Sequence, residues 1–258
     1  MGLYKSLLAF DYNDCMTYLA IIPLGLLAGW LVNYLADVLP ATRSFSRPTC
    51  AYCRQAFTIT DYLLLRACRS CGHARSRRTY LTQAILLLGT LYIWIVPPKS
   101  LSFWVAYILL IYLAVVFVID LEHRLILHPI SLTGAVLGFG IGARLYGWQT
   151  SLIGGAVGFG SMLALYWLGE VFARTMSKRR GEKIEDALGY GDVNLAGVIG
   201  LLLGYPLILF GLLAAILLGG VFSLLFILFM LVRKKYQAFA AIPYAPFMIL
   251  SVIYVLYF

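Results

Sequence analysis

The chain has 258 residues, of which 62% are hydrophobic, 15% aromatic and only 12% charged. A soluble domain carries about 25% charged and about 45–50% apolar residues, so this composition indicates an integral membrane protein. It excludes secreted, disordered, coiled-coil and nucleic-acid-binding proteins. The formal charge of +9 is first explained by cytoplasmic loops, because such loops retain lysine and arginine in membrane proteins.

Eight apolar runs follow one another along the chain and are candidate membrane spans. A bilayer core of about 30 Å needs about 20 helical residues. The sequence therefore predicts an all-α, polytopic transmembrane helix bundle of about eight spans. The runs are 16–39, 80–96, 101–120, 130–146, 151–173, 192–204, 206–232 and 240–258. Glycines that would let helices pack closely recur within them, as at Gly134, Gly138, Gly142, Gly154 and Gly158.

The distribution of positive charge predicts the orientation of the chain. If residues 40–79 are cytoplasmic and every run crosses, the cytoplasmic segments hold 17 of the 20 lysines and arginines. Positive residues favour the cytoplasmic side, so both termini are expected outside the cytoplasm. The expected organisation is a tail with the first span (1–39), a small cytoplasmic zinc-binding loop domain (40–79) and a transmembrane core (80–258).

The zinc prediction rests on two CxxC pairs in the polar loop 40–79. Four thiolates complete a tetrahedral Zn²⁺ shell, and a short loop gains from the metal the folding energy that it lacks. The reducing cytoplasm argues against disulfides. Redox dithiols or an iron cluster are the alternatives. The ligands would be Cys50, Cys53, Cys68 and Cys71, with Cys15 an apolar filler and His73 a surface residue.

Two acidic residues stand at the ends of apolar runs. Asp120 closes an uncharged run, and Asp192 follows Gly189-Tyr-Gly191 and opens another. A carboxylate at the membrane boundary is a candidate functional residue. Two that meet in a partly dry site cannot both ionise readily, and such a pair can hydrolyse peptides. The alternative is two separate interfacial acids, each bound to a basic loop residue.

Most of the other acids have less specific interpretations. Glu170 is expected to reach the interface or to pair with Arg174, four residues on. Asp37 ends the first span. The acids in polar loops are expected to be solvated, and they are Asp61, Glu182, Glu185 and Asp186.

Five elements, in order, resemble the prepilin leader peptidases, aspartic membrane proteases with a GxGD motif that process type IV pilins and type II secretion pseudopilins. They are Gly29-Trp-Leu-Val-Asn33 with Leu39-Pro40, the two CxxC pairs, the segment from Asp120 to Pro129, Gly189-Tyr-Gly-Asp192, and Ile242-Pro-Tyr-Ala-Pro-Phe247. The resemblance covers nearly the whole chain. It implies a multi-pass enzyme of the bacterial inner membrane that cleaves a short leader after glycine at the cytoplasmic face.

The resemblance also implies roles for individual residues. Asp120 and Asp192 would be the catalytic pair, and the four cysteines the zinc ligands. Gly189 and Gly191 are expected to free the backbone so that Asp192 approaches the substrate closely. Glu122 and His123 would tune Asp120 or lie at headgroup level. The implied partners are prepilin or pseudopilin helices and membrane lipid, with no nucleic acid.

The sequence departs from the family pattern at several positions. Asn194 stands where relatives often have lysine, and Gln83 where they often have glutamate. Many relatives also N-methylate the new N-terminus with S-adenosylmethionine, but no glycine-rich nucleotide loop is present here. Two other functions stay open: a proton-coupled transporter that uses the acid pair, and a noncatalytic assembly factor that recruits partners through the zinc loop.

Overall fold

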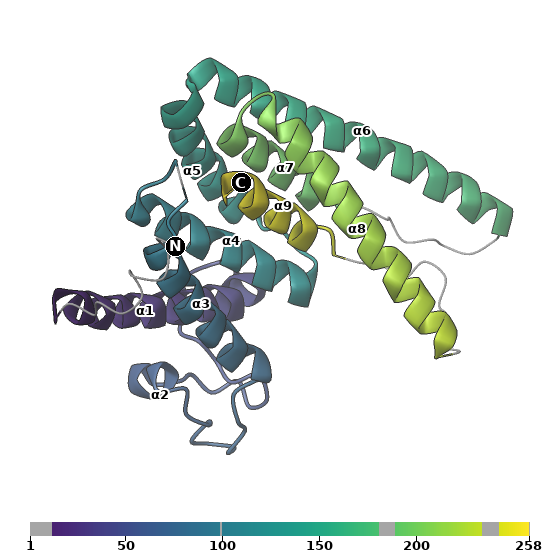
Figure 1. Cartoon of the computed structure of the whole chain (residues 1–258). Helices are drawn as coiled ribbons and strands as arrows, with labels where there is room; N and C mark the ends of the chain where they lie inside the picture. The colour runs from purple at the N-terminus through teal and green to yellow at the C-terminus, as the bar shows by residue number, and fades with distance from the viewer. Residues whose placement is uncertain (1–11, 99, 181–188, 234–242, 258) are drawn as a thin grey trace. The chain divides into compact units, whose positions relative to one another are not determined.

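The computed structural model describes residues 12–98, 100–180, 189–233 and 243–257. These residues form nine α-helices and no β-strand, with one isolated antiparallel bridge between Thr49 and Ala56 (Figure 1). The helices are α1 (Tyr12–Thr42), α2 (Ile59–Leu63), α3 (Arg77–Ile95), α4 (Phe103–His123), α5 (His128–Tyr146), α6 (Trp148–Arg180), α7 (Tyr190–Leu203), α8 (Leu207–Val232) and α9 (Ala245–Tyr257).

The predicted apolar runs coincide with helices α1 and α3 to α9, so the all-α prediction is confirmed for the described residues. Among these residues, four helical segments have both the length and the hydropathy to cross a membrane. They are Ile21–Thr42, Phe103–His123, Trp148–Thr175 and Leu207–Val232. The α7 and α9 helices are apolar but have only 14 and 13 residues. Eight membrane crossings therefore stay a prediction.

The chain divides into two compact units between Val115 and Val116. In the first unit, α1 and α3 pack side by side. Gly25 allows this approach, because a Cβ there would lie 2.8 Å from Cδ1 of Leu87. Asn33 donates from Nδ2 to the Thr79 carbonyl at 3.2 Å. The cysteine-rich loop joins these two helices, so it shares a unit with them, and the predicted boundaries at 40 and 79 stay a prediction.

In the second unit, α7 is the central helix. Ten of its 14 residues are buried, as expected for a helix that is hydrophobic all round. Its length of about 21 Å, at 1.5 Å per residue, is less than the bilayer core of about 30 Å. The α7 helix is thus a core element of the unit, in which α5, α6, α8 and α9 also pack.

Small residues set the spacing around α7. A Cβ at Gly154 would collide with the Gly200 carbonyl, and one at Gly158 with the Ala196 carbonyl. A Cβ at Gly138 of α5 would lie 2.8 Å from the Val198 carbonyl oxygen. Close helix contacts of this kind replace the hydrophobic effect as the source of stability inside a membrane. The prediction that glycines serve helix packing is confirmed for Gly138, Gly154 and Gly158.

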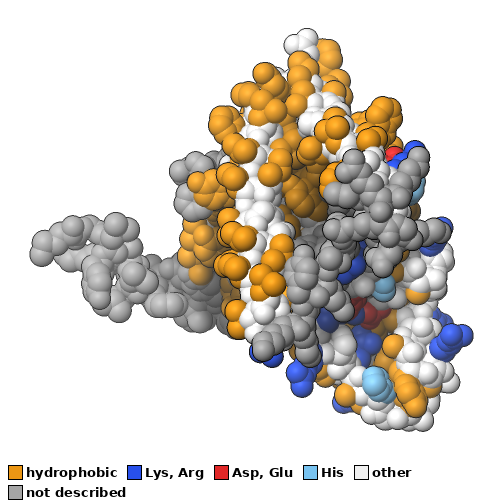
Figure 2. All heavy atoms as spheres, turned by 90° about the vertical axis from the view of Figure 1, so that its right-hand side faces the viewer, with side chains coloured by type: hydrophobic (Ala, Val, Ile, Leu, Met, Phe, Trp, Pro, Cys, Tyr) orange, Lys and Arg blue, Asp and Glu red, His pale blue; other side chains and the backbone are white. Residues whose placement is uncertain are grey.

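The α8 helix presents an apolar outer surface. Only 11% of its most apolar window is buried inside the structure, and the mean hydropathy of that window is 2.8. Hydrophobic side chains also dominate much of the face drawn in Figure 2. Such a surface is stable when lipid covers it.

Candidate active site and metal centre

Asp120 lies at the end of α4 in the second unit. Its side chain follows a long apolar stretch and is 4% exposed. The helix ends because Arg124 takes a positive φ of 51°, with its N–H donating to the Asp120 carbonyl at 2.9 Å. Among the described residues, no group hydrogen-bonds to Oδ2 of Asp120. A buried carboxylate oxygen is thus left for chemistry.

Asp192 lies in the first turn of α7. Gly189 is the N-cap residue, and its N–H donates to Oδ2 of Asp192 at 3.1 Å. This contact satisfies one backbone donor at the helix start, where a negative charge is also favoured by the helix dipole. The Asp192 residue is 9% exposed. The sequence around Asp192 therefore orients the carboxylate through the helix that it begins.

The structure brings the two predicted carboxylates together. The negative charge of Asp120 acts on Asp192, and the backbone N–H of Ala245 acts on Asp120. Tyr244, next to Ala245, is close enough to Asp192 to feel its charge. The end of α4 and the beginnings of α7 and α9 therefore lie near one another, with two nearly buried acids among them. Such a pair can hold one proton between two carboxylates and exchange it with a bound substrate.

The two glycines of the motif have different surroundings. A Cβ at Gly191 would lie 2.9 Å from Cβ of Ile126, in the segment that follows α4. A Cβ at Gly189 would meet Oδ2 of Asp192 at 3.5 Å, an ordinary contact. Gly189 has a φ of −83°, which other residues also adopt. The structure gives Gly191 a packing role that the sequence did not indicate.

The two residues predicted to support Asp120 have exposed side chains. Nε2 of His123 lies 3.9 Å from Oε2 of Glu122. Both are about two-fifths exposed, as expected for polar residues at the level of lipid headgroups.

The four loop cysteines form a cluster in the first unit. Their sulfur atoms lie within 4.8 Å of one another, with Cys50 to Cys71 at 3.7 Å and Cys53 to Cys68 at 3.5 Å. Zinc–sulfur bonds of about 2.3 Å in a tetrahedron place the sulfurs about 3.8 Å apart. A disulfide would be much shorter, at about 2.05 Å. The donor set and its spacing therefore fit a zinc ion.

The two CxxC segments have the same backbone shape. Arg54 and Gly72, each directly after the second cysteine, have positive φ values of 59° and 69°. Their N–H groups donate to the carbonyls of Cys50 and Cys68 at 2.9 and 2.8 Å. This turn bends each pair so that both sulfurs face the same point. His73 lies beside the cluster and stacks on Tyr52, with ring centroids 5.7 Å apart.

Backbone donors stabilise thiolates at the cluster. The N–H groups of Cys53 and Tyr52 lower the pKa of Cys50, and those of Cys71 and Ser70 lower the pKa of Cys68 to about 6. At Cys71 the N–H of His73 acts in the same direction, but burial and the three other sulfurs raise its pKa to about 12. Four sulfurs at one point therefore resist full ionisation, which a divalent cation relieves.

Asp61 is a residue whose role the sequence did not show. It was expected to be solvated, yet it is only 2% exposed. Oδ2 accepts a hydrogen bond from the Thr58 hydroxyl at 2.5 Å and an ion pair from Nε of Arg69 at 2.7 Å. The hydrogen bond from Thr58 has the largest effect, the contact with Arg69 adds to it, and both lower the pKa of Asp61. Because Arg69 stands inside the second CxxC pair, Asp61 anchors that turn to α2.

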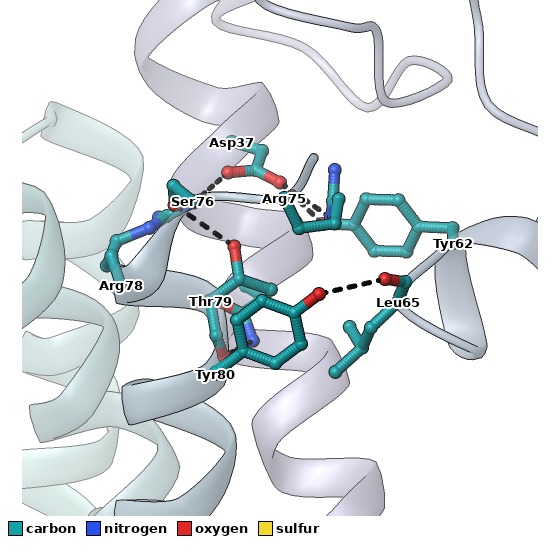
Figure 3. Close-up of polar contacts among 9 residues, drawn as sticks. Asp37, Tyr62, Leu65, Arg75, Ser76, Arg78, Thr79 and Tyr80 are labelled. Carbon is teal, nitrogen blue, oxygen red and sulfur yellow. Dashed lines mark hydrogen bonds and ion pairs between the residues drawn. The ribbon is translucent and has the colours of Figure 1, made fainter. Parts of the chain in front are cut away.

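Asp37 joins the cysteine-rich loop 40–79, called the metal loop from here on, to the membrane helices. Figure 3 shows its carboxylate facing Arg75 and Arg78. Oδ2 accepts a hydrogen bond from the Tyr62 hydroxyl at 2.7 Å. The Arg75 guanidinium also lies 4.3 Å from the Tyr62 ring centroid and 4.7 Å from that of Phe57. An excess of arginine in the loop was the only sequence signal for this network.

The other predicted contacts have separate outcomes. Arg174 pairs with Glu170 on α6, so this prediction is confirmed. Glu182, Glu185, Asp186 and Ile242 lie outside the described residues.

Part of the chain is similar in sequence to a known protein family. Residues 107–224 match the type IV leader peptidase family, and this segment contains Asp120 and Asp192. The prepilin leader peptidase/N-methyltransferase of Pectobacterium carotovorum subsp. carotovorum is 32% identical over 168 residues, which cover 61% of this chain and 56% of that protein. The protein of the same description from Myxococcus xanthus is 30% identical over 223 residues, 80% of this chain and 62% of that protein.

A third relative has a related description. The type 4 prepilin-like proteins leader peptide-processing enzyme of Escherichia coli O78:H11 is 30% identical over 169 residues, 60% of this chain and 57% of that protein. The chain therefore spans less than two thirds of the length of these curated relatives. No solved structure matches the chain.

The fold and these matches define the class of the protein: it is a helical membrane protein that contains a segment of a peptidase family. Residues 107–224 form a segment of the type IV leader peptidase family, and the resemblance found in the sequence is confirmed.

Proposed function

We propose that the chain is a membrane-embedded aspartic endopeptidase that removes the short leader of type IV prepilins or type II secretion pseudopilins. The observation that carries the proposal is the meeting of Asp120 and Asp192, two nearly buried carboxylates within the family segment. The descriptions of the three relatives support the class of substrate.

The proposed reaction uses the acid pair with one shared proton. The ionised carboxylate removes a proton from water as the water oxygen attacks the scissile carbonyl carbon. The protonated carboxylate polarises the carbonyl oxygen, and a proton then passes to the nitrogen of the departing amine as the C–N bond breaks. Water is consumed, and the products are a leader carboxylate and a new N-terminal amine.

A backbone N–H group binds each of the two carboxylates. The Gly189 N–H holds Oδ2 of Asp192, and the Ala245 N–H acts on Asp120. These fixed donors orient both carboxylates and leave the proton that the carboxylates share free to move. The α7 helix is shorter than the bilayer is thick, so Asp192 at its beginning would lie slightly below the membrane surface.

We place this site at the cytoplasmic face of a bacterial inner membrane, with both termini outside the cytoplasm. The support is the strong bias of lysine and arginine to the segments on one side of the predicted spans. A prepilin helix already in the bilayer could then present the start of its leader to the acid pair.

The proposed cofactor is a structural zinc ion held by Cys50, Cys53, Cys68 and Cys71. The ion would fix the loop, whose small core gains little hydrophobic stability. N-methylation of the new N-terminus with S-adenosylmethionine is not part of this proposal. Where the side chains of the first unit are described, the carboxylates of Asp37 and Asp61 are both bound to arginines, so neither is available to bind the ribose of that cofactor.

Single amide replacements of the acids test the function. Asp120→Asn and Asp192→Asn preserve size, so both variants should fold, while cleavage of a prepilin-like peptide should fall by about 10²–10⁴-fold because a general acid or base is lost. Mass spectrometry of the products and circular dichroism of each variant supply the measurements. Glu122→Gln, which changes an exposed carboxylate two residues from Asp120, is the control. Near-normal cleavage by either aspartate variant would refute the proposal.

A further inference from the structure

The first unit contains an open groove of about 1010 Å³ between α1 and the metal loop. Leu27, Leu31 and Tyr34 line it from α1, while Phe45 and Ile59 line it from the loop. The loop thus folds back along the helix that precedes it.

Polar contacts hold the two walls of the groove together. The Tyr34 hydroxyl donates to the Ser46 carbonyl at 2.9 Å and fixes the start of the loop on α1. The Tyr62 hydroxyl, from the far side of the loop, donates to Asp37 of α1 (Figure 3). The groove is therefore part of the folded unit, with one attachment to α1 on each side of the loop.

The α1 wall belongs to a segment that can cross a membrane, Ile21–Thr42. Leu27 and Leu31 are 52% and 44% exposed, so they would contact lipid. From Leu27 to Tyr34 the helix rises about 10 Å at 1.5 Å per residue. Because loop residues line the same groove, they lie beside a part of α1 that acyl chains would cover.

The loop wall has the surface expected at that depth. Phe45 and Ile59 are each 79% exposed. Burying such a side chain contributes about 1.5–3 kcal/mol, so water is an unfavourable surrounding for both. Their apolar surfaces continue that of α1, and lipid can cover all three.

Charge identifies the kind of lipid. Arg47 lines the same groove. The loop 40–79 contains eight arginines and one acid, Asp61, which is itself paired. A basic residue beside an acyl-chain groove matches a negatively charged headgroup.

We propose that this groove binds an anionic phospholipid from the leaflet on the metal-loop side of the membrane. One acyl chain lies along Leu27 and Leu31, beneath Phe45 and Ile59, and the headgroup phosphate contacts Arg47. The proposal is independent of the peptidase reaction, because all of its residues belong to the first unit.

Photo-crosslinking of the full-length, metal-loaded protein tests the position of the lipid. The protein carries p-benzoylphenylalanine at Phe45 and is reconstituted in nanodiscs of phosphatidylglycerol and phosphatidylcholine in equal amounts. Tyr52 is the matched control, because it is 77% exposed on the same loop but does not line the groove. We expect several-fold more lipid adduct at position 45 than at position 52. Ile59 is a second labelling position if the first variant fails to retain metal.

Charge variants test the lipid class. Arg47→Gln should reduce the ratio of phosphatidylglycerol to phosphatidylcholine adducts about fivefold, the contribution of one basic residue near an anionic surface. Arg77→Gln, an exposed change at the start of α3 and outside the groove, should leave the ratio unchanged. Equal labelling at 45 and 52, or an unchanged ratio in Arg47→Gln, would overturn the proposal. Loss of the lipid adduct when a prepilin-like helix is added would instead assign the groove to a protein partner and would also overturn it.

Discussion

Gly191 lies directly against Ile126, so that a Cβ at position 191 would be 2.9 Å from the Cβ of Ile126. Two Cβ atoms do not approach so closely, and rotation of the Ile126 side chain cannot relieve the contact, because the backbone fixes the position of its Cβ. The contact joins the first turn of α7 to the segment that follows α4. It therefore couples the positions of Asp192 and Asp120 through the backbone.

Gly191→Ala should lower the kcat/KM of leader cleavage by about 10–100-fold, because a displacement of about 1 Å at a reacting group has an effect of this size. Gly189→Ala should change it by only a few-fold, because a Cβ there meets an ordinary contact of 3.5 Å. Peptide cleavage by both purified variants, compared at equal helical content, is the measurement. Equal losses in the two variants would show that the glycines act through backbone freedom and not through Ile126.

The different surroundings of Gly189 and Gly191 show what the sequence could and could not predict. Apolar runs predicted the helices, because hydrophobicity is a local property. CxxC spacing predicted the metal cluster, because each pair closes its own turn. Gly189 and Gly191 look equivalent in the sequence, since Ile126 is distant along the chain. The burial of α7 was also hidden, because an apolar helix in lipid and one inside a protein have similar compositions.

The ion pairs of the first unit were missed for a related reason. Asp37 and Asp61 each have several arginines nearby in the sequence, and no spacing rule selects one. Arg75 and Arg78 meet Asp37 only after the loop returns to α1. Long-range polar pairing depends on a fold that local patterns do not specify.

The metal centre gives a second prediction. Cys→Ser at any one of Cys50, Cys53, Cys68 or Cys71 should reduce zinc from one ion per chain and make the loop sensitive to protease, because a three-sulfur site binds more weakly. Cleavage activity should fall as a secondary effect. Elemental analysis after purification without added chelator gives the metal content. Cys15→Ser is the control and should retain the full amount, whereas metal-free wild-type protein would contradict the zinc assignment.

Tyr62 gives a prediction for alkaline pH. Burial, and then the negative charge of Asp37, raise the pKa of Tyr62 above its usual value of about 10. The folded state therefore retains the phenolic proton more strongly than the unfolded state. By linkage, the contribution of Tyr62 to stability is complete below about pH 10 and is lost as the pH rises through the raised pKa.

The rate of zinc transfer to excess chelator measures the opening of the loop. Tyr62→Phe should release zinc about 10–100-fold faster than wild type at pH 8, since it lacks a hydrogen bond to a charged acceptor worth about 1.5–3 kcal/mol. The ratio of the zinc-release rate of Tyr62→Phe to that of wild type should fall toward one above about pH 10. Tyr80→Phe removes an exposed hydroxyl that donates to the Leu65 carbonyl at 3.2 Å and should have little effect. A ratio independent of pH would exclude the Tyr62 to Asp37 contact as its source.

The geometry of the acid pair also limits the substrate. Asp120 and Asp192 are 4% and 9% exposed, so a substrate carbonyl must come close to reach them. A folded helix hides its carbonyls in internal hydrogen bonds, and the cleaved bond must therefore lie in an extended or unwound stretch. Glycine just before the cut permits both the backbone freedom and the close approach.

Replacing this substrate glycine by alanine should slow processing, and replacing it by valine should stop it, because each added methyl group occupies the space that the carboxylates require. Neutralising the positive charges of the leader should only slow cleavage, since those charges would contact lipid headgroups at a distance from the scissile bond. Mass spectrometry of a prepilin series reconstituted with the enzyme locates the cut and gives the rate. Equal rates for glycine and valine substrates would refute the close-approach argument. A cut deep within the hydrophobic helix would exclude a site at the membrane boundary, because that peptide bond lies near the middle of the bilayer.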